Sequence, residues 1–264
     1  MNVHQQQSAR HTRSAISLAA IVACAAVTGC APAPQPHALT TSESQALAIA
    51  RFKNFAEGTR AISISVLSNE QQLGVHGYFD YASGAGVAQV WIGASPPENV
   101  TTNLLWWTDA LVGEYVSLDA APDMSEEPPL DLLEQAGWEY YELDGQLSPL
   151  MAMLATTAAL GFDRPDNPLL LVQTDALWLG DGELPLPSQP LGTWYQLPSS
   201  DEARTTPISL SANPATPRVL LDEDSMMWSA ERVLEGLEPS VLEYGRTVNI
   251  SIPVPIATEP NSSR

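Results

Sequence analysis

RAISISVLSNEQQLGVHGYFDYASGAGVAQVWIGA, residues 60–94, is the stretch that decides the fold. Ile62, Ile64 and Val66 alternate with small or polar residues, which is the two-residue period of a strand with one apolar face. The turn-like segments SNEQQ and SGAG separate this strand from two further ones, and residues 101–118 supply a fourth. Four strands joined by short turns predict an antiparallel meander, and the glycines inside or beside them predict a strongly curved sheet.

The segments on either side of this meander predict short helices. Ser42 and Gln45 have the spacing of a capping box, and apolar residues then recur at helical spacing until Gly58. After the meander, DLLEQAGWEYYELD at 131–144 predicts a short helix followed by a strand or loop. The sequence therefore indicates an α+β domain.

A further helix is predicted in QLSPLMAMLATTAALGF, residues 146–162. Pro149 marks its first turn, and apolar side chains follow on every side, with Thr156 and Thr157 as the only polar positions. A helix that is apolar all round must be covered all round, and this one is too short to span a membrane. We expect it to lie between the sheet and a second layer, which is either more protein or an apolar ligand.

A polar loop precedes the last third of the chain. Asn167 and Pro168 have the pattern of a helix start. Asp163, Arg164 and Asp166, just before them, are either a polar site or a loop held by its own hydrogen bonds and charge pair.

The last third of the chain predicts broken strands. Prolines are dense over 184–216, which predicts a loop or a broken edge strand. RVLLDEDSMMW predicts a hairpin that turns at 222–225, and the alternation of Val248, Ile250 and Ile252 predicts a final strand.

The N-terminal segment has the layout of a signal peptide. Arg10 and Arg13 precede an uncharged stretch over 15–27 that is too short for a transmembrane helix. VTGC, which ends at Cys30, resembles the bacterial lipobox, although that pattern prefers Leu and then Ala or Ser where this chain has Val and Thr. We expect Cys30 to be acylated after cleavage. The alternatives are an ordinary secretory peptide with an incidental cysteine and an uncleaved anchor.

This interpretation divides the chain into four parts. Residues 1–29 are the expected signal peptide, 30–44 a flexible proline-rich tether, 45–255 a single α+β domain and 256–264 a disordered tail. Two acyl chains on Cys30 would hold the protein stably on a bilayer. We therefore expect the extracytoplasmic face of the cell membrane as its location.

Composition excludes several classes of function. Loss of Arg10 and Arg13 leaves nine basic residues against 31 acidic ones, a net charge of −22, which disfavours nucleic-acid binding. His37 and His76 are then the only histidines, GxSxG is absent, and no histidine pair has zinc-site spacing. We expect no catalytic residues, no metal and no cofactor, and we expect a monomer.

Several of these features together resemble a known group of proteins. A lipidated cysteine, ARFKNFAEG, GYFDYASGAGVAQV, LLWW, GFDRPDNPLLLVQ and LLDEDSMMW are similar to uncharacterised actinobacterial lipoproteins related in architecture to the LppX, LprG and LolA lipid carriers. The resemblance implies a half-barrel, in which helices pack on the concave face of a strongly curved antiparallel sheet and leave an apolar cavity. The expected cavity residues are Leu150, Met151, Met153, Leu154, Ile64, Val75, Phe79 and Trp91.

Two functions remain open at this point. In the first, the domain binds a lipid, an acyl chain or another hydrophobic molecule for transport or sensing at the cell envelope. In the second, the core is solid and the acidic exterior serves as a scaffold or interaction surface for another envelope protein.

Overall fold

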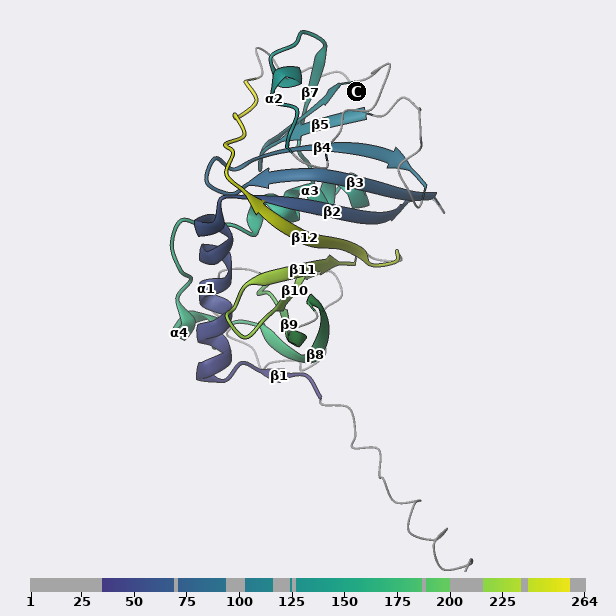
Figure 1. The fold of residues 1–264 in the computed structure, drawn as a ribbon. Coiled ribbons are helices and arrows are strands. Elements are labelled where there is room, and N and C mark those ends of the chain that lie inside the picture. Colours follow the sequence, from purple (N-terminus) through teal and green to yellow (C-terminus); the bar gives the residue numbers. More distant parts are fainter. Residues whose placement is uncertain are drawn as a thin grey trace, which may run out of the picture. The chain divides into compact units, whose positions relative to one another are not determined.

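One antiparallel sheet organises the molecule. The computed structural model describes residues 35–68, 71–93, 103–115, 124, 127–186, 189–199, 216–233 and 237–256. In this part of the chain twelve strands form a single sheet in the order β1-β8-β9-β10-β11-β12-β2-β3-β4-β5-β6-β7, and every neighbouring pair is antiparallel. Figure 1 shows the strands and the four helices α1–α4.

The bounds of the elements are as follows. The strands are β1 (His37–Ala38), β2 (Thr59–Ser68), β3 (Gln71–Asp80), β4 (Ala85–Ile92), β5 (Asn103–Trp107), β6 (Leu111–Tyr115), β7 (Trp138–Glu142), β8 (Leu177–Leu186), β9 (Gln189–Gln196), β10 (Arg218–Leu221), β11 (Met227–Arg232) and β12 (Ser240–Val248). The helices are α1 (Thr41–Glu57), α2 (Leu130–Leu133), α3 (Pro149–Ala159) and α4 (Pro168–Leu171).

The first half of the sheet is the predicted meander. Strands β2 to β6 follow one another in the sheet, and β7 completes it. Ile62, Ile64 and Val66 are buried, whereas Ser65 between them is exposed, which confirms the alternation in β2. The described part of the fourth predicted strand, 103–115 of 101–118, is a hairpin of two strands, β5 and β6, which turns at Thr108.

The proline-rich region contains one strand, β9, and the end of another, β8. We expected a loop or a broken edge strand over 184–216, but β8 extends to Leu186 and β9 lies inside the sheet between β8 and β10. Pro185 lies where the β8–β9 register shifts, between Glu183 and Leu186. A proline is tolerated at such an irregularity because no ladder hydrogen bond is required of it there. Residues 200–215 lie outside the described part.

The chain enters the fold earlier than expected. Residues up to 44 were predicted to be a tether, yet His37 and Ala38 pair with β8, and the His37 ring stacks on Trp178 at 4.6 Å. The capping box of α1 is formed by Thr40 and Glu43 rather than by Ser42 and Gln45. The compact unit therefore begins at residue 35.

Helix α3 is covered by the sheet along most of its length. It contacts β2, β3 and β12, and Ala152, Met153 and Leu154 are fully buried. The hydroxyls of Thr156 and Thr157 donate to the carbonyl oxygens four residues earlier, at 2.7 and 2.8 Å. These bonds explain why two polar residues are tolerated in a buried helix. None of the helices described is long and apolar enough to cross a membrane.

The two faces of the sheet carry separate clusters of apolar side chains. The larger one joins α1 and α3 to strands from both halves of the sheet. The smaller one lies around Tyr78, Val87 and Trp106, and includes Ile252 of the C-terminal segment. Val248, Ile250 and Ile252 were predicted to alternate in a final strand, but β12 ends at Val248. Beyond it the chain is held by Asp80, whose carboxylate accepts hydrogen bonds from the Ser251 hydroxyl and the Ile252 amide.

Candidate functional site

The side chains predicted to line a cavity lie mostly in the packed interior. Ile64, Val75, Phe79, Met153 and Leu154 are between 0 and 2% exposed and belong to one cluster. Leu150 and Met151 pack against that cluster from its margin. None of these seven side chains lines the cavity described below.

Trp91 lies on the opposite face of the sheet. Val90 pairs with Val75, which faces the interior, so Trp91 points the other way because side chains alternate along a strand. Its indole covers Gly74, where a Cβ atom would meet the ring at 2.3 Å. With Ser63, Ser65 and polar neighbours it borders a groove of about 320 Å³ on that face. We had expected Trp91 to be a neighbour of Met153 and Leu154. Its position on the opposite face shows that this expectation is wrong.

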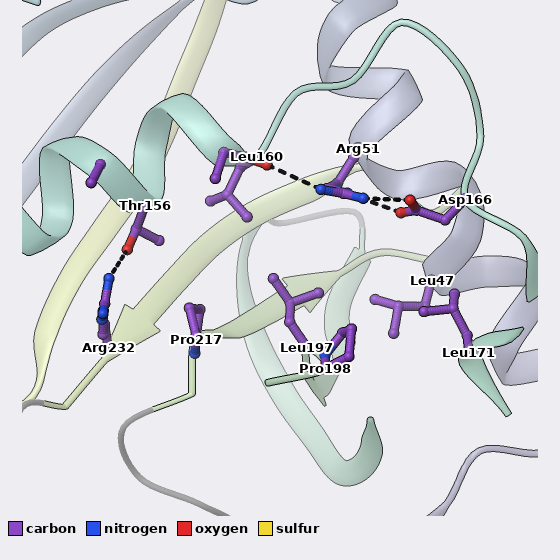
Figure 2. A pocket seen from close by; sticks show the side chains of 12 residues that line it. Leu47, Arg51, Thr156, Leu160, Asp166, Leu171, Leu197, Pro198, Pro217 and Arg232 are labelled. Atoms are coloured by element: carbon purple, nitrogen blue, oxygen red, sulfur yellow. Dashed lines mark hydrogen bonds and ion pairs between the residues drawn. The ribbon is translucent and has the colours of Figure 1, made fainter. Parts of the chain in front are cut away.

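A cavity of about 250 Å³ lies where α1, α3 and α4 meet the ends of three strands. Its walls are mainly leucine, alanine and proline, and four polar side chains join them (Figure 2). The lining residues are Leu47 and Arg51 of α1, Ala155, Thr156, Ala159 and Leu160 of and after α3, Asp166, Leu171, Leu197, Pro198, Pro217 and Arg232.

One end of the cavity is closed by an ion pair between α1 and the loop before α4. Arg51 donates to both carboxylate oxygens of Asp166, through Nε at 2.9 Å and through Nη2. The Asp166 amide also donates to the Ala48 carbonyl oxygen at 2.8 Å, which fixes this loop to α1. A bidentate arginine–carboxylate pair is a directional contact, so this end is held in one geometry.

The polar loop at 163–166 is thus not held by a charge pair of its own. We considered Asp163, Arg164 and Asp166 as a polar site or a self-contained loop, but Asp166 pairs with Arg51, which is 115 residues away in sequence. The guanidinium of Arg164 instead lies over the Phe162 ring, 5.1 Å from its centroid. The predicted start of α4 is confirmed, since the Asn167 side chain accepts from the Leu169 amide.

The other end of the cavity holds a second arginine with different partners. Arg232, the last residue of β11, donates through Nη1 to the Thr156 hydroxyl at 3.1 Å and to the Ala152 carbonyl oxygen at 3.4 Å. Figure 2 shows Arg232 and Thr156 on the side away from Arg51 and Asp166, with Leu197, Pro198 and Pro217 along the wall between them. The cavity therefore combines apolar walls with a guanidinium group at each end.

A buried polar network outside the cavity lining fixes α1 to the sheet. Arg60 is 2% exposed and donates to Asn54 Oδ1 at 2.9 Å and to the Met227 carbonyl oxygen at 2.7 Å. Its guanidinium lies 4.3 Å from the centroid of the Tyr244 ring, and the Tyr244 and Tyr81 hydroxyls are 2.5 Å apart. Burial lowers the pKa of Arg60 and raises the pKa of Tyr244 to about 12. The sequence contains no pattern that predicts this network.

His76, Ser63 and Glu243 lie side by side on the other face of the sheet. Ser63 pairs with His76 of β3 and with Glu243 of β12, so the serine lies between the other two. A relay in which histidine takes the serine proton requires the carboxylate to bind the far side of the imidazole. The His76 ring instead bonds to the Met124 backbone, and burial lowers its pKa. Within the described residues no cluster of three potential metal ligands occurs.

No family model matches the sequence, and no curated protein matches it. Among solved structures, the chain is similar to the crystal structure of an uncharacterized conserved protein from Thermus thermophilus. The alignment has 12% identity and a TM-score of 0.38, and covers 81% of this chain and 90% of that one.

Proposed function

We propose that this chain is a lipid-anchored binding module at the extracytoplasmic face of the cell membrane, which takes a small apolar molecule into the cavity between α1, α3 and α4. The observation that carries the proposal is the cavity itself, because its walls are apolar although it lies beside a closely packed core. Apolar walls with a few placed polar groups are typical of ligand sites.

The size of the cavity limits the ligand. Ligand pockets usually have volumes from about 300 Å³ upwards, and this cavity, at about 250 Å³, lies just below that range. It therefore suits a single short apolar chain or a compact small molecule better than a lipid with several acyl chains. This is a narrower role than the lipid carriage that the sequence led us to expect.

The fold is compatible with the half-barrel of the LolA/LppX-like carriers. Support comes from the all-antiparallel sheet, from the position of β2 at its middle, and from the contribution of both α1 and α3 to one cluster on one face. In our proposal this face is the concave side of the curved sheet. The ligand then lies at the margin of the helix layer and not beneath α3.

Acylation of Cys30, which lies outside the described residues, would place the module close to the lipid. Only six residues separate Cys30 from β1. A fully extended chain of this length reaches about 25 Å, whereas the tether that we expected from the sequence would reach about 40 Å. Cys30→Ala is expected to move the protein from the membrane fraction to the soluble fraction. Its persistence in membranes would indicate an uncleaved anchor.

Native mass spectrometry tests the binding function directly. The full chain carrying Cys30→Ala, purified without detergent, is expected to retain a reproducible extra mass that organic solvent extracts. Ala159→Phe, which fills the cavity from an exposed position at the end of α3, is expected to abolish that mass. Ala56→Phe, at an exposed position of α1 outside the cavity, is the matched control and is expected to retain it. Absence of extra mass from every sample, and failure of added decanoate and decanol to bind, would refute the proposal.

A scaffold function remains the second candidate because the interior beneath α3 is filled. Ile64, Val75, Phe79, Met153 and Leu154 pack there with at most 2% exposure. A protein without a ligand would then act through its acidic exterior. Two results together would favour this candidate. The purified chain would carry no ligand, and Ala159→Phe would not change the amount of a membrane protein partner that is recovered with it.

A further inference from the structure

The two arginines of the cavity differ in how their charges are balanced. Arg51 is neutralised by Asp166 through two hydrogen bonds. Arg232 forms no ion pair with any carboxylate in the part of the chain that the structure describes. This is unexpected in a protein with 31 acidic and 11 basic residues.

The strand geometry explains why the adjacent Glu231 forms no ion pair with Arg232. Glu231 pairs across β10 with Arg218 and across β12 with Val241. Since successive side chains point to opposite faces of a sheet, Glu231 and Arg232 point away from each other. The Arg232 guanidinium therefore lies at the cavity, whereas the Glu231 carboxylate lies on the other face of the sheet.

Among the described residues, the hydrogen bonds of Arg232 use only one of its three guanidinium nitrogen atoms. Nη1 is bonded to Thr156 and Ala152, whereas Nε is buried without a partner among the described residues. Burial lowers the pKa of Arg232, and no carboxylate in the described part of the chain offsets this effect. An arginine nevertheless stays protonated at neutral pH, so a positive charge without a carboxylate partner among the described residues borders an apolar cavity.

We infer that Arg232, with Thr156, is the anion-binding end of the cavity, and that the ligand is an amphiphile whose carboxylate or phosphate group lies there while its apolar part lies against Leu47, Leu160 and Leu197. This inference rests on the proposed binding function. The planar guanidinium matches the two oxygens of either anion. Asp166 does not repel such a ligand strongly, because Arg51 neutralises it at the other end.

The test compares probes that share one apolar chain and differ only at the end. Decanoate, decyl phosphate and 1-decanol are titrated into the full chain carrying Cys30→Ala, and dissociation constants are measured by calorimetry. Hydrogen bonds to a charged group in a partly desolvated site change affinity by roughly ten-fold or more. We expect at least one anionic probe to bind about ten-fold more tightly than decanol. Whether carboxylate or phosphate binds more tightly then identifies the anion.

Three variants locate the effect. Arg232→Gln is expected to reduce the affinity for the anion to that for decanol without changing decanol binding, and Arg232→Lys is expected to give an intermediate affinity. Arg218→Gln is the matched control, because Arg218 is also half-buried with an unpartnered Nε but does not line the cavity. It is expected to change neither affinity.

The possible failures are distinguishable. Equal binding of decanol and both anions by the unsubstituted chain would overturn the assignment of Arg232 and leave the binding function in place. The assignment would also be overturned by an anion preference that survives Arg232→Gln. If none of the three probes binds, the proposed function itself fails. The probe comparison needs no substitution at Arg232, so it stands even if a variant does not fold.

Discussion

The two sides of α3 show how one helix serves two purposes. Met153 and Leu154 are fully buried against the sheet, whereas Ala155, Thr156 and Ala159 line the cavity. The buried side uses large apolar residues that fill space, and the cavity side uses small residues together with a hydroxyl. The difference shows that an entirely apolar helix does not imply a cavity beneath it, because the space can lie at its margin.

The strongest test of this contrast is a charge in the filled side. Met153→Asp places an unpaired carboxylate among side chains with no exposure, and we expect it to lower the free energy of unfolding by about 4 kcal/mol or more. Urea denaturation followed by circular dichroism measures the loss. Leu147→Asp, at a position that is 73% exposed just before α3, is the control and should change stability by less than about 0.5 kcal/mol. A stable Met153→Asp variant that only loses ligand would place the cavity beneath α3 after all.

A matched pair of leucines compares the two regions with the same substitution. Leu154→Ala removes a fully buried side chain and should destabilise the protein by about 3–5 kcal/mol. Leu197→Ala removes a half-buried side chain that already faces open space, so we expect a loss of about 1 kcal/mol. Equal losses in urea titrations of the two variants would mean that the cavity wall is packed as tightly as the core.

The sequence predicted more of the filled region beneath α3 than of the cavity. The alternation in β2 and the turn between β3 and β4 are local patterns, and one-sided burial fixes their register. The local sequence also contains the information that orients Trp91. This residue follows Val90 in the strand, and Val90 faces inward. The expectation that Trp91 lines an interior cavity is wrong, because alternation directs its side chain to the opposite face.

The cavity depends on contacts that no local pattern contains. Arg232 and Thr156 are 76 residues apart, and Arg51 and Asp166 are 115 apart. Of the lining residues that the structure describes, Asp166 alone was a candidate from the sequence, and its partner was not. Likewise, the prolines near Pro185 suggested a loop because the irregular pairing that accommodates them is visible only in the sheet.

Alkaline pH probes the filled region without a substitution in α3. Tyr244 has its pKa raised to about 12 by burial, and burial also raises the pKa of Tyr81 well above its ordinary value of 10. Below pH 10 both are protonated in the folded and unfolded states. Between pH 10 and 12 the unfolded chain loses these protons first, so stability should fall by up to about 1.4 kcal/mol per pH unit for each tyrosine. Urea midpoints at pH 9, 10 and 11 measure the slope.

The control for this pH effect is Tyr244→Phe, which removes one of the two groups. The variant should show a shallower decline above pH 10, because only Tyr81 of the pair then resists ionisation. Its stability at pH 8 should also be lower, since Tyr81 loses its hydroxyl partner. A slope identical to that of the unsubstituted protein would contradict the burial of Tyr244.

The smallest expected effect lies at the cavity end held by Arg51 and Asp166. Their side chains are 27 and 21% exposed, so the pair is screened less than a surface pair but is not fully desolvated. A double-mutant cycle with Arg51→Gln and Asp166→Asn should give a coupling of about 1 kcal/mol that decreases in high salt. Arg164→Gln in the same loop should couple weakly to Asp166→Asn, since Arg164 lies over Phe162. A coupling near zero for Arg51 and Asp166 would mean that the loop before α4 is held to α1 by its backbone bonds to the Ala48 and Arg51 carbonyl oxygens and not by the ion pair.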